Sequence, residues 1–252
     1  WFERMKAVEG NTFFYAVPAA ERVTGWADRM LDGFQICPKL HRDITHDGPL
    51  LPRKAAAADF IQVMKHFDEH LGPFHLQLPP SYGPEYDQDL ERFLTAWPRK
   101  KGPIVVELRH PDWFEQTRRE RLDSMLGRLG VERVLLDTRP VYEGPGDPQV
   151  DSNRQKPELP LHPERTASRV MVRYIGHPDL PRNTPYLERW AERVDCWLRE
   201  DVDVYFFVHC PDERHSPQIA RHFQRLLEEL GAPVPPLPWN ELPDLPHQGD
   251  LL

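Results

Sequence analysis

The chain has 252 residues, of which 39% are apolar, so it is long enough to bury a sizeable core. Its net charge of -8 argues against general nucleic-acid binding, and a mean hydropathy of -0.64 with no apolar run near eighteen residues excludes a membrane span. The N-terminal stretch lacks the pattern of a signal peptide, and Cys37, Cys196 and Cys210 show no CxxC pairing. We therefore expect a cytoplasmic protein with free thiols, formed by a single domain over residues 1–252 with a proline-rich extension from about residue 232.

Seven short apolar runs have the length and composition of β-strands. They are rich in Val, Ile and Phe and span residues 5–14, 34–39, 74–79, 104–110, 133–138, 169–175 and 204–209. Amphipathic patterns with helical spacing lie between most of them, for example over residues 23–31 and 60–71. Alternating strands and helices imply parallel strands joined by right-handed crossovers, in either an open doubly wound sheet or a closed barrel.

Each of the seven runs ends in polar side chains, although their interiors are largely apolar. In both architectures the ligand site lies at the carboxyl ends of the strands, so these side chains should gather on one rim. Because strand side chains alternate between faces, Glu9 shares a face with Asn11, and Glu107 shares one with Arg109. The residues expected at this rim are Glu9, Asn11, Lys39, Gln77, Glu107, Arg109, Asp137, Arg173 and His209.

The residue types at the rim indicate acid/base chemistry on a charged molecule. Glu9, Glu107 and Asp137 are the candidate catalytic groups, because carboxylates can donate or accept protons. Basic side chains from separate strands favour the binding of phosphate or carboxylate groups. The candidate binding residues are Asn11, Lys39, His46, Gln77, Arg109, Arg173 and His209. His46 and Asp47 are either a base and its orienting partner or residues that only shape their loop. The alternative for each charged pair is an interior ion pair that only satisfies two charges.

Several stretches resemble the YecE-like family, also called domain of unknown function 72. They are "VEGNTFFYAVP", "ITHDGPL", "LQLPPSYG", "VVELRHPDWF", "LLDTRPV", "VRYIGHP" and "YFFVHCPDE", in this order from about residue 6 to about residue 230. The resemblance implies an α/β fold with a TIM-type β/α barrel whose first strand is absent from the chain as given, and it implies no reaction. It also points to "RQKP", with Arg154, Lys156 and Pro157, in a long segment over residues 138–168 that could cover the site.

Three classes of function follow from these observations. The first is an enzyme that acts by acid/base chemistry on a small anionic or polyhydroxylated molecule. The second is a metal-dependent hydrolase or isomerase, with Asp137, His209 and either Glu9 or Glu107 as ligands. The third is a non-catalytic binder of an anionic ligand or single-stranded nucleic acid, although the overall charge makes nucleic acid the less favoured ligand. The sequence identifies no cofactor and no oligomeric state, and we assign Trp26, Trp97, Trp190 and Trp197 to packing between helices and strands.

Overall fold

The structure, a computed structural model, describes residues 4–143, 146, 148–149, 156–237 and 239. All seven predicted apolar runs contain strands, and all strand pairs are parallel. The fifth run is divided into two short strands at Val134, whose N–H donates to the carbonyl of Val106 at 2.8 Å. The strands are β1 (Ala7–Gly10), β2 (Gln35–Pro38), β3 (Phe74–Gln77), β4 (Ile104–Glu107), β5 (Glu132–Arg133), β6 (Leu135–Asp137), β7 (Arg169–Ile175) and β8 (Asp203–His209).

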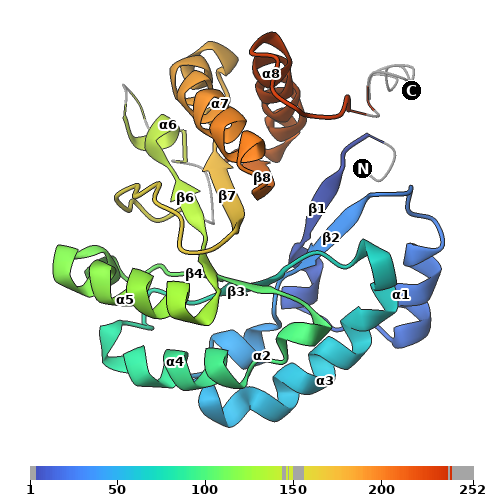
Figure 1. Ribbon diagram of the computed structural model, residues 1–252, viewed down its shortest axis with the longest axis vertical. Coiled ribbons are helices and arrows are strands. Elements are labelled where there is room, and N and C mark those ends of the chain that lie inside the picture. Colours follow the sequence, from blue (N-terminus) through green and yellow to red (C-terminus); the bar gives the residue numbers. More distant parts are fainter. Residues whose placement is uncertain (1–3, 144–145, 147, 150–155, 238, 240–252) are drawn as a thin grey trace.

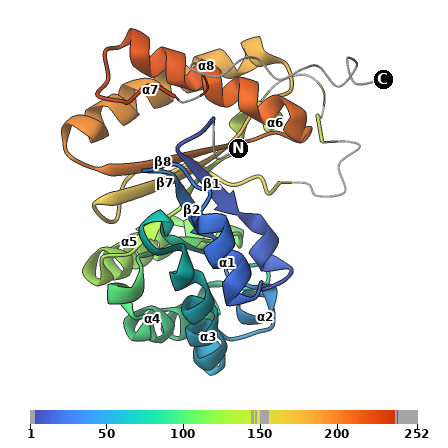
Figure 2. The ribbon, with the colours of Figure 1, turned by 90° about the vertical axis from the view of Figure 1, so that its right-hand side faces the viewer.

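Helices cover the outer side of the strands (Figures 1 and 2). The first five lie around β1 to β4, and α7 and α8 pack together against β8. No helix in the described ranges is both long and apolar enough to cross a membrane. The helices are α1 (Ala20–Ala27), α2 (Arg42–Thr45), α3 (Lys54–Met64), α4 (Asp87–Ala96), α5 (Gln116–Leu129), α6 (Arg139–Tyr142), α7 (Thr184–Arg199) and α8 (Ser216–Glu229).

The strands form three parallel sheets and not a closed barrel. Their orders are β1-β2, β3-β4-β5 and β6-β7-β8. Isolated bridges at Ile36–Leu71 and Lys39–His75 connect β2 to the β3 region, whereas no ladder joins β8 to β1 in the part of the chain that the structure describes. The prediction of an α/β fold with parallel strands is therefore confirmed, but the closed TIM-type barrel is not shown.

The inner face of the strands has an apolar layer with a polar layer directly after it. Cys37, Val105, Met171 and Phe207 pack together in the apolar layer, where partly buried Ala7 joins them. Side chains two residues further along a strand lie on the same face. These following positions are occupied by Glu9, Lys39, Glu107, Arg173 and His209. Along the inner face of the strands, apolar side chains therefore fill the space first, and charged groups follow them toward the carboxyl ends.

Trp97 and Trp190 pack between helices and strands, as predicted, and Trp197 belongs to the same buried cluster as Trp190, whereas Trp26 packs against the rings of Phe13 and Phe67. The ring of Trp97 lies 5.3 Å from that of Phe74 in β3, and the ring of Trp190 lies 5.8 Å from that of Phe206 in β8, measured between ring centroids. The outer core therefore uses its largest side chains for packing. None of Trp26, Trp97, Trp190 and Trp197 is among the described residues that line the cavity discussed next.

Candidate functional site

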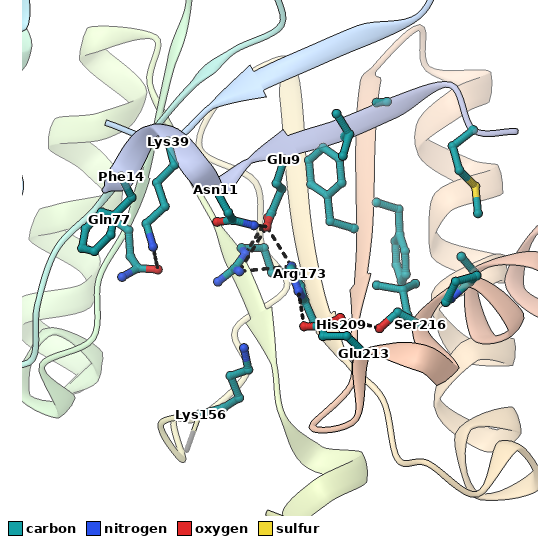
Figure 3. Close-up of a pocket in the computed structure, with 18 of the residues that line it drawn as sticks. Glu9, Asn11, Phe14, Lys39, Gln77, Lys156, Arg173, His209, Glu213 and Ser216 are labelled. Carbon is teal, nitrogen blue, oxygen red and sulfur yellow. Dashed lines mark hydrogen bonds and ion pairs between the residues drawn. The ribbon is translucent and has the colours of Figure 1, made fainter. Parts of the chain in front are cut away.

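A cavity of about 830 Å³ opens at the carboxyl ends of the strands (Figure 3). The cavity has a polar part and an apolar part, and the apolar part runs between β1 and β8, along Val8, Phe206 and Val208. The polar part lies over the charged layer of the inner face, which is where ligand sites of parallel α/β proteins occur. Its polar lining residues include Glu9, Asn11, Lys39, His46, Gln77, Arg109, Lys156, Arg173, His209 and Glu213.

Arg173 of β7 forms the floor of this cavity. Its Nε donates to Glu9 Oε1 at 2.6 Å, and its second guanidinium branch donates to Glu107 Oε2 at 2.8 Å. Burial alone would raise the pKa of both carboxyls and is the largest single effect on each. The charge of Arg173 outweighs it only together with His209 at Glu9 and with Arg109 and His75 at Glu107, so the pKa of each lies well below the ordinary value. The floor is therefore a buried, charge-paired cluster in which each guanidinium nitrogen has a partner.

Glu107 lies beneath the cavity and is not one of the described residues that line it. Its side chain is 0% exposed, and its carboxylate contacts three groups: His75 Nε2 at 3.0 Å, Arg109 Nε at 2.7 Å and Arg173. The prediction that Glu107 lines the site is therefore wrong. The alternation of side chains along the strand correctly predicts the face on which Glu107 lies. The side chains of Gln77, Arg109 and Arg173, however, lie between Glu107 and the cavity.

Lys39 follows β2 and brings an ammonium group into the cavity. Its Nζ donates to Gln77 Oε1 at 2.9 Å and lies 4.2 Å from the centroid of the Phe14 ring. Burial, together with the charges of Arg173 and Arg109, outweighs the attraction of nearby carboxylates and lowers the pKa of Lys39 to about 8. Among the described residues no carboxylate forms an ion pair with this ammonium.

Lys156 supplies a second cation from the long segment after α6. Figure 3 shows its side chain reaching from that segment toward the cluster of Glu9, Asn11 and Arg173. Burial, followed by the charge of Arg173, lowers the pKa of Lys156. No ion pair joins Lys156 to a carboxylate among the described residues either. Because Lys156 lines the cavity, the expectation that this segment contributes to the site is supported. Arg154 lies outside the described residues.

His209 of β8 lies between two carboxylates and a guanidinium. Its Nε2 is 2.8 Å from Glu9 Oε2 and 3.1 Å from the Arg173 guanidinium, and its Nδ1 is 3.3 Å from Glu213 Oε1. A neutral imidazole with its proton on Nε2 would donate to Glu9, and one with its proton on Nδ1 would donate to Glu213 and accept from Arg173. An imidazolium would donate to Glu213 and Glu9. Either protonation state therefore has hydrogen-bond partners in this arrangement.

His46 lines the cavity from the residue after α2. Its Nδ1 is 2.7 Å from the Thr45 hydroxyl, and its ring packs edge-on against Phe14 with centroids 4.8 Å apart. Burial and the charge of Lys39 lower the pKa of His46 to about 4, so its imidazole is neutral at pH 7. Asp47 does not orient it, because the Asp47 carboxylate pairs with Arg53.

Asp137 is not brought into the cavity, contrary to its predicted place at the rim. Its carboxylate accepts from the Arg139 guanidinium at 2.8 Å and from Trp190 Nε1 of α7 at 2.7 Å, and it is fully buried. The reason is strand alternation: Leu135, two residues earlier, packs in the outer core with Trp190, so Asp137 also faces the helices. The metal site that needed Asp137 is therefore not assembled, and the described residues contain no group of three or more His, Cys, Asp or Glu side chains placed to hold a metal ion.

Phe14, Lys156 and Glu213 are among the lining residues that lay outside the predicted site residues. Phe14 ends the short 3-10 helix after β1, and Glu213 starts the one after β8. Glu213 was visible in the sequence as an acid four residues after His209, just beyond the carboxyl end of the last predicted strand. No local pattern distinguishes Phe14 from the two aromatic residues beside it, or Lys156 from a surface lysine.

The fold and the cavity define a parallel α/β protein with a charged pocket at the carboxyl ends of its strands. A model of the family described as "Protein of unknown function DUF72" matches residues 1–242. The UPF0759 protein YecE of Escherichia coli strain K12 is 32% identical over 247 residues, which cover 97% of this chain and 88% of that protein. The chain therefore belongs to the DUF72 family, as its motifs indicated.

Solved structures support the fold. Two crystal structures of a DUF72 family protein from Enterococcus faecalis V583 superpose with TM-scores of 0.64 and 0.65. They are 16% and 18% identical to this chain and match 88% of it, over 85% and 90% of their own lengths. At this identity the likeness concerns the arrangement of strands and helices, and the chemistry must be argued from the cavity itself.

Proposed function

We propose that the cavity binds a small anionic molecule and exchanges a proton with it. The observation that carries this proposal is the difference between the two kinds of cation at the site. Arg173 and Arg109 are matched by carboxylates, whereas Lys39 and Lys156 lack a carboxylate partner among the described residues. Burying an ammonium group without a counter-ion is unfavourable, and an anionic ligand would supply that counter-ion.

The proton-exchanging group in this proposal is His209, with Glu9 behind it. Glu9 accepts from His209 on the floor side, where its own carboxylate is held by Arg173 and by the Asn11 amide at 3.0 Å. On the opposite nitrogen the contact to Glu213 is longer, at 3.3 Å, and the Glu213 side chain is 60% exposed. A bound molecule can replace Glu213 at Nδ1 and take or give a proton there, while Glu9 stabilises the imidazolium.

Thermal unfolding at constant ionic strength tests the anion site, with inorganic phosphate as the probe. If phosphate binds the folded state alone, a hundredfold excess over its dissociation constant should stabilise the protein by about 2.7 kcal/mol, and the melting temperature should rise with phosphate concentration. Lys39→Met and Lys156→Met should each lose most of this rise. Lys100→Met removes an exposed lysine of the same kind and should keep it.

Equal increases in all four proteins would mean that phosphate acts by exclusion from the surface, and the anion site would then be rejected. Arg173→Met is not a suitable variant for testing phosphate binding, although an arginine at the end of a strand is an obvious candidate for an anion ligand. Its guanidinium is bound to two buried carboxylates, so this change alters the floor and not only the ligand contacts.

A further inference from the structure

The Lys39 amine has the surroundings of a nucleophile. The residue is 9% exposed, its Nζ contacts the carbonyl oxygen of the Gln77 amide, and the Phe14 ring covers it. Arg109 donates to the same Gln77 oxygen at 2.8 Å, so two cationic groups meet at one neutral acceptor. Loss of a proton from Lys39 relieves this crowding and breaks no ion pair among the described residues.

We propose that Lys39 forms an imine with an anionic aldehyde or ketone bound in the cavity. This inference rests on the proposed anion site and specifies the class of molecule that enters it. The neutral amine forms a bond to the carbonyl carbon as the carbonyl π electrons move to oxygen. A proton passes from nitrogen to that oxygen to give a carbinolamine. The oxygen then takes a second proton and leaves as water, and a protonated imine remains.

The other groups at the cavity fit this substrate class. Lys156 and Arg109 line the same cavity and can hold a carboxylate or phosphate group of the molecule while its carbonyl lies at Lys39. His209 is a group that can supply and recover the protons needed when the carbinolamine loses water. The volume of about 830 Å³ accommodates a small metabolite of this kind.

The charges around Lys39 keep part of its population neutral near physiological pH. Arg173 of β7 and Arg109 after β4 oppose the ammonium, as does burial, while Glu107 of β4 and Glu9 of β1 favour it, and the balance lowers the pKa to about 8 from an ordinary 10.5. The imidazole of His46, which also packs against Phe14, is neutral at pH 7. At this pH the neutral fraction of Lys39 is therefore about 300-fold larger than that of an exposed lysine.

Reductive trapping tests the proposal. The protein is incubated at pH 7 with glyoxylate and cyanoborohydride, which reduces an imine to carboxymethyl-lysine, and peptide mass spectrometry follows Lys39, Lys65 and Lys100 in one sample. We expect Lys39 to be modified at least about tenfold faster than the two exposed lysines, and phosphate to slow the reaction at Lys39 alone. Acetaldehyde, which carries no charge, should show a smaller preference for Lys39.

Modification of Lys39 no faster than that of Lys100 would overturn the imine proposal. Lys39→Arg keeps the positive charge without the nucleophile, and it should retain the phosphate response with no labelling at position 39. If phosphate stabilises the protein through Lys39 but glyoxylate does not label it, the anion site stands and the imine is rejected. If neither effect occurs, both proposals fail.

Discussion

Replacing Arg173 with methionine tests the interpretation of the floor as a charge-paired cluster. Methionine preserves much of the apolar length of the side chain but removes every guanidinium contact. Glu9 would lose both of its hydrogen bonds from Arg173 and keep those from Asn11 and His209. Glu107 would lose one hydrogen bond and keep its partners Arg109 and His75. The change therefore leaves a buried carboxylate pair with one cation fewer.

The expected cost follows from the burial of all three groups. Their side chains are between 0% and 4% exposed, so solvent screening is weak. Removing one partner of a buried ion pair costs about 3–5 kcal/mol. Because Glu107 keeps two partners and Glu9 keeps its contact with His209, we expect a loss of about 4 kcal/mol in the free energy of unfolding at pH 7.

The same change should reverse the pH dependence of the cluster. In the native protein the pKa of Glu9 and Glu107 lies well below 4.5, so their contribution to stability is present above pH 4.5 and is lost as pH falls through the folded values. Without Arg173, burial dominates and raises these pKa values above the unfolded ones. The variant then gains stability from these groups as pH falls, and the difference between the two proteins should shrink between pH 7 and pH 4.

Urea unfolding followed by tryptophan fluorescence at several pH values measures both effects. Arg118→Met is the control, because Arg118 pairs with Asp112 at 2.9 Å on the surface, where an ion pair contributes about 0–1 kcal/mol. A loss below about 1 kcal/mol for Arg173→Met, or a loss that is constant from pH 7 to pH 4, would show that the guanidinium does not hold these carboxylates as charged groups.

Three further predictions concern single side chains. The pKa of Lys39 is lowered to about 8, so its charge opposes folding below that pH. Lys39→Met should therefore raise the free energy of unfolding at pH 7 by about 1–3 kcal/mol. Urea titrations should show this gain fading as pH rises from 8 toward 10. Asp137→Asn removes a carboxylate that accepts hydrogen bonds from Arg139 and Trp190, so the free energy of unfolding in urea should fall by about 2–3 kcal/mol. The stabilisation by phosphate should stay intact, and its loss would show that Asp137 belongs to the binding site. In NMR titrations His46 should protonate near pH 4, and phosphate should raise this midpoint by offsetting the charge of Lys39; a midpoint of 6.5 without phosphate would contradict the arrangement described here.

The elements of the fold were predictable because each strand is short, apolar and bounded by turn residues. All seven runs contain strands, and the polar groups that end or follow them gathered at the cavity for β1, β2, β3, β4, β7 and β8. Closure of the sheet was not predictable from periodicity, since the hydrogen bonds between the last and first strands depend on their placement in space. Alternation also explains the failure at Asp137: in "LLD" the first leucine and the aspartate share a face, and the leucine packs against the helices.

Pairing between charges was the part that sequence reasoning could not assign. Glu9 and Arg173 are 164 positions apart, yet they form the shortest ion pair of the floor. When each basic residue was considered separately, Arg173 and Lys39 were equivalent candidates for binding an anion. The structure separates them, because the depth of each side chain relative to its neighbours decides whether it meets a carboxylate or the cavity. Lys156 could be related to the site only through family resemblance, since its segment has no periodic pattern.

The strongest argument for the proposed ligand site is the contrast between the paired charges of the cavity floor and the two lysines above it, Lys39 and Lys156. An interior that needed only to be filled could continue the apolar layer of Cys37, Val105 and Met171, because a buried ion cluster gives little net stability compared with well-packed apolar side chains. The floor instead fixes two carboxylates and a guanidinium in place. Above it, Lys39 and Lys156 are held at a free-energy cost that the nearby carboxylates offset only in part. A rigid, paired floor beneath unpaired cations is the arrangement expected of a site whose missing charge arrives with its ligand.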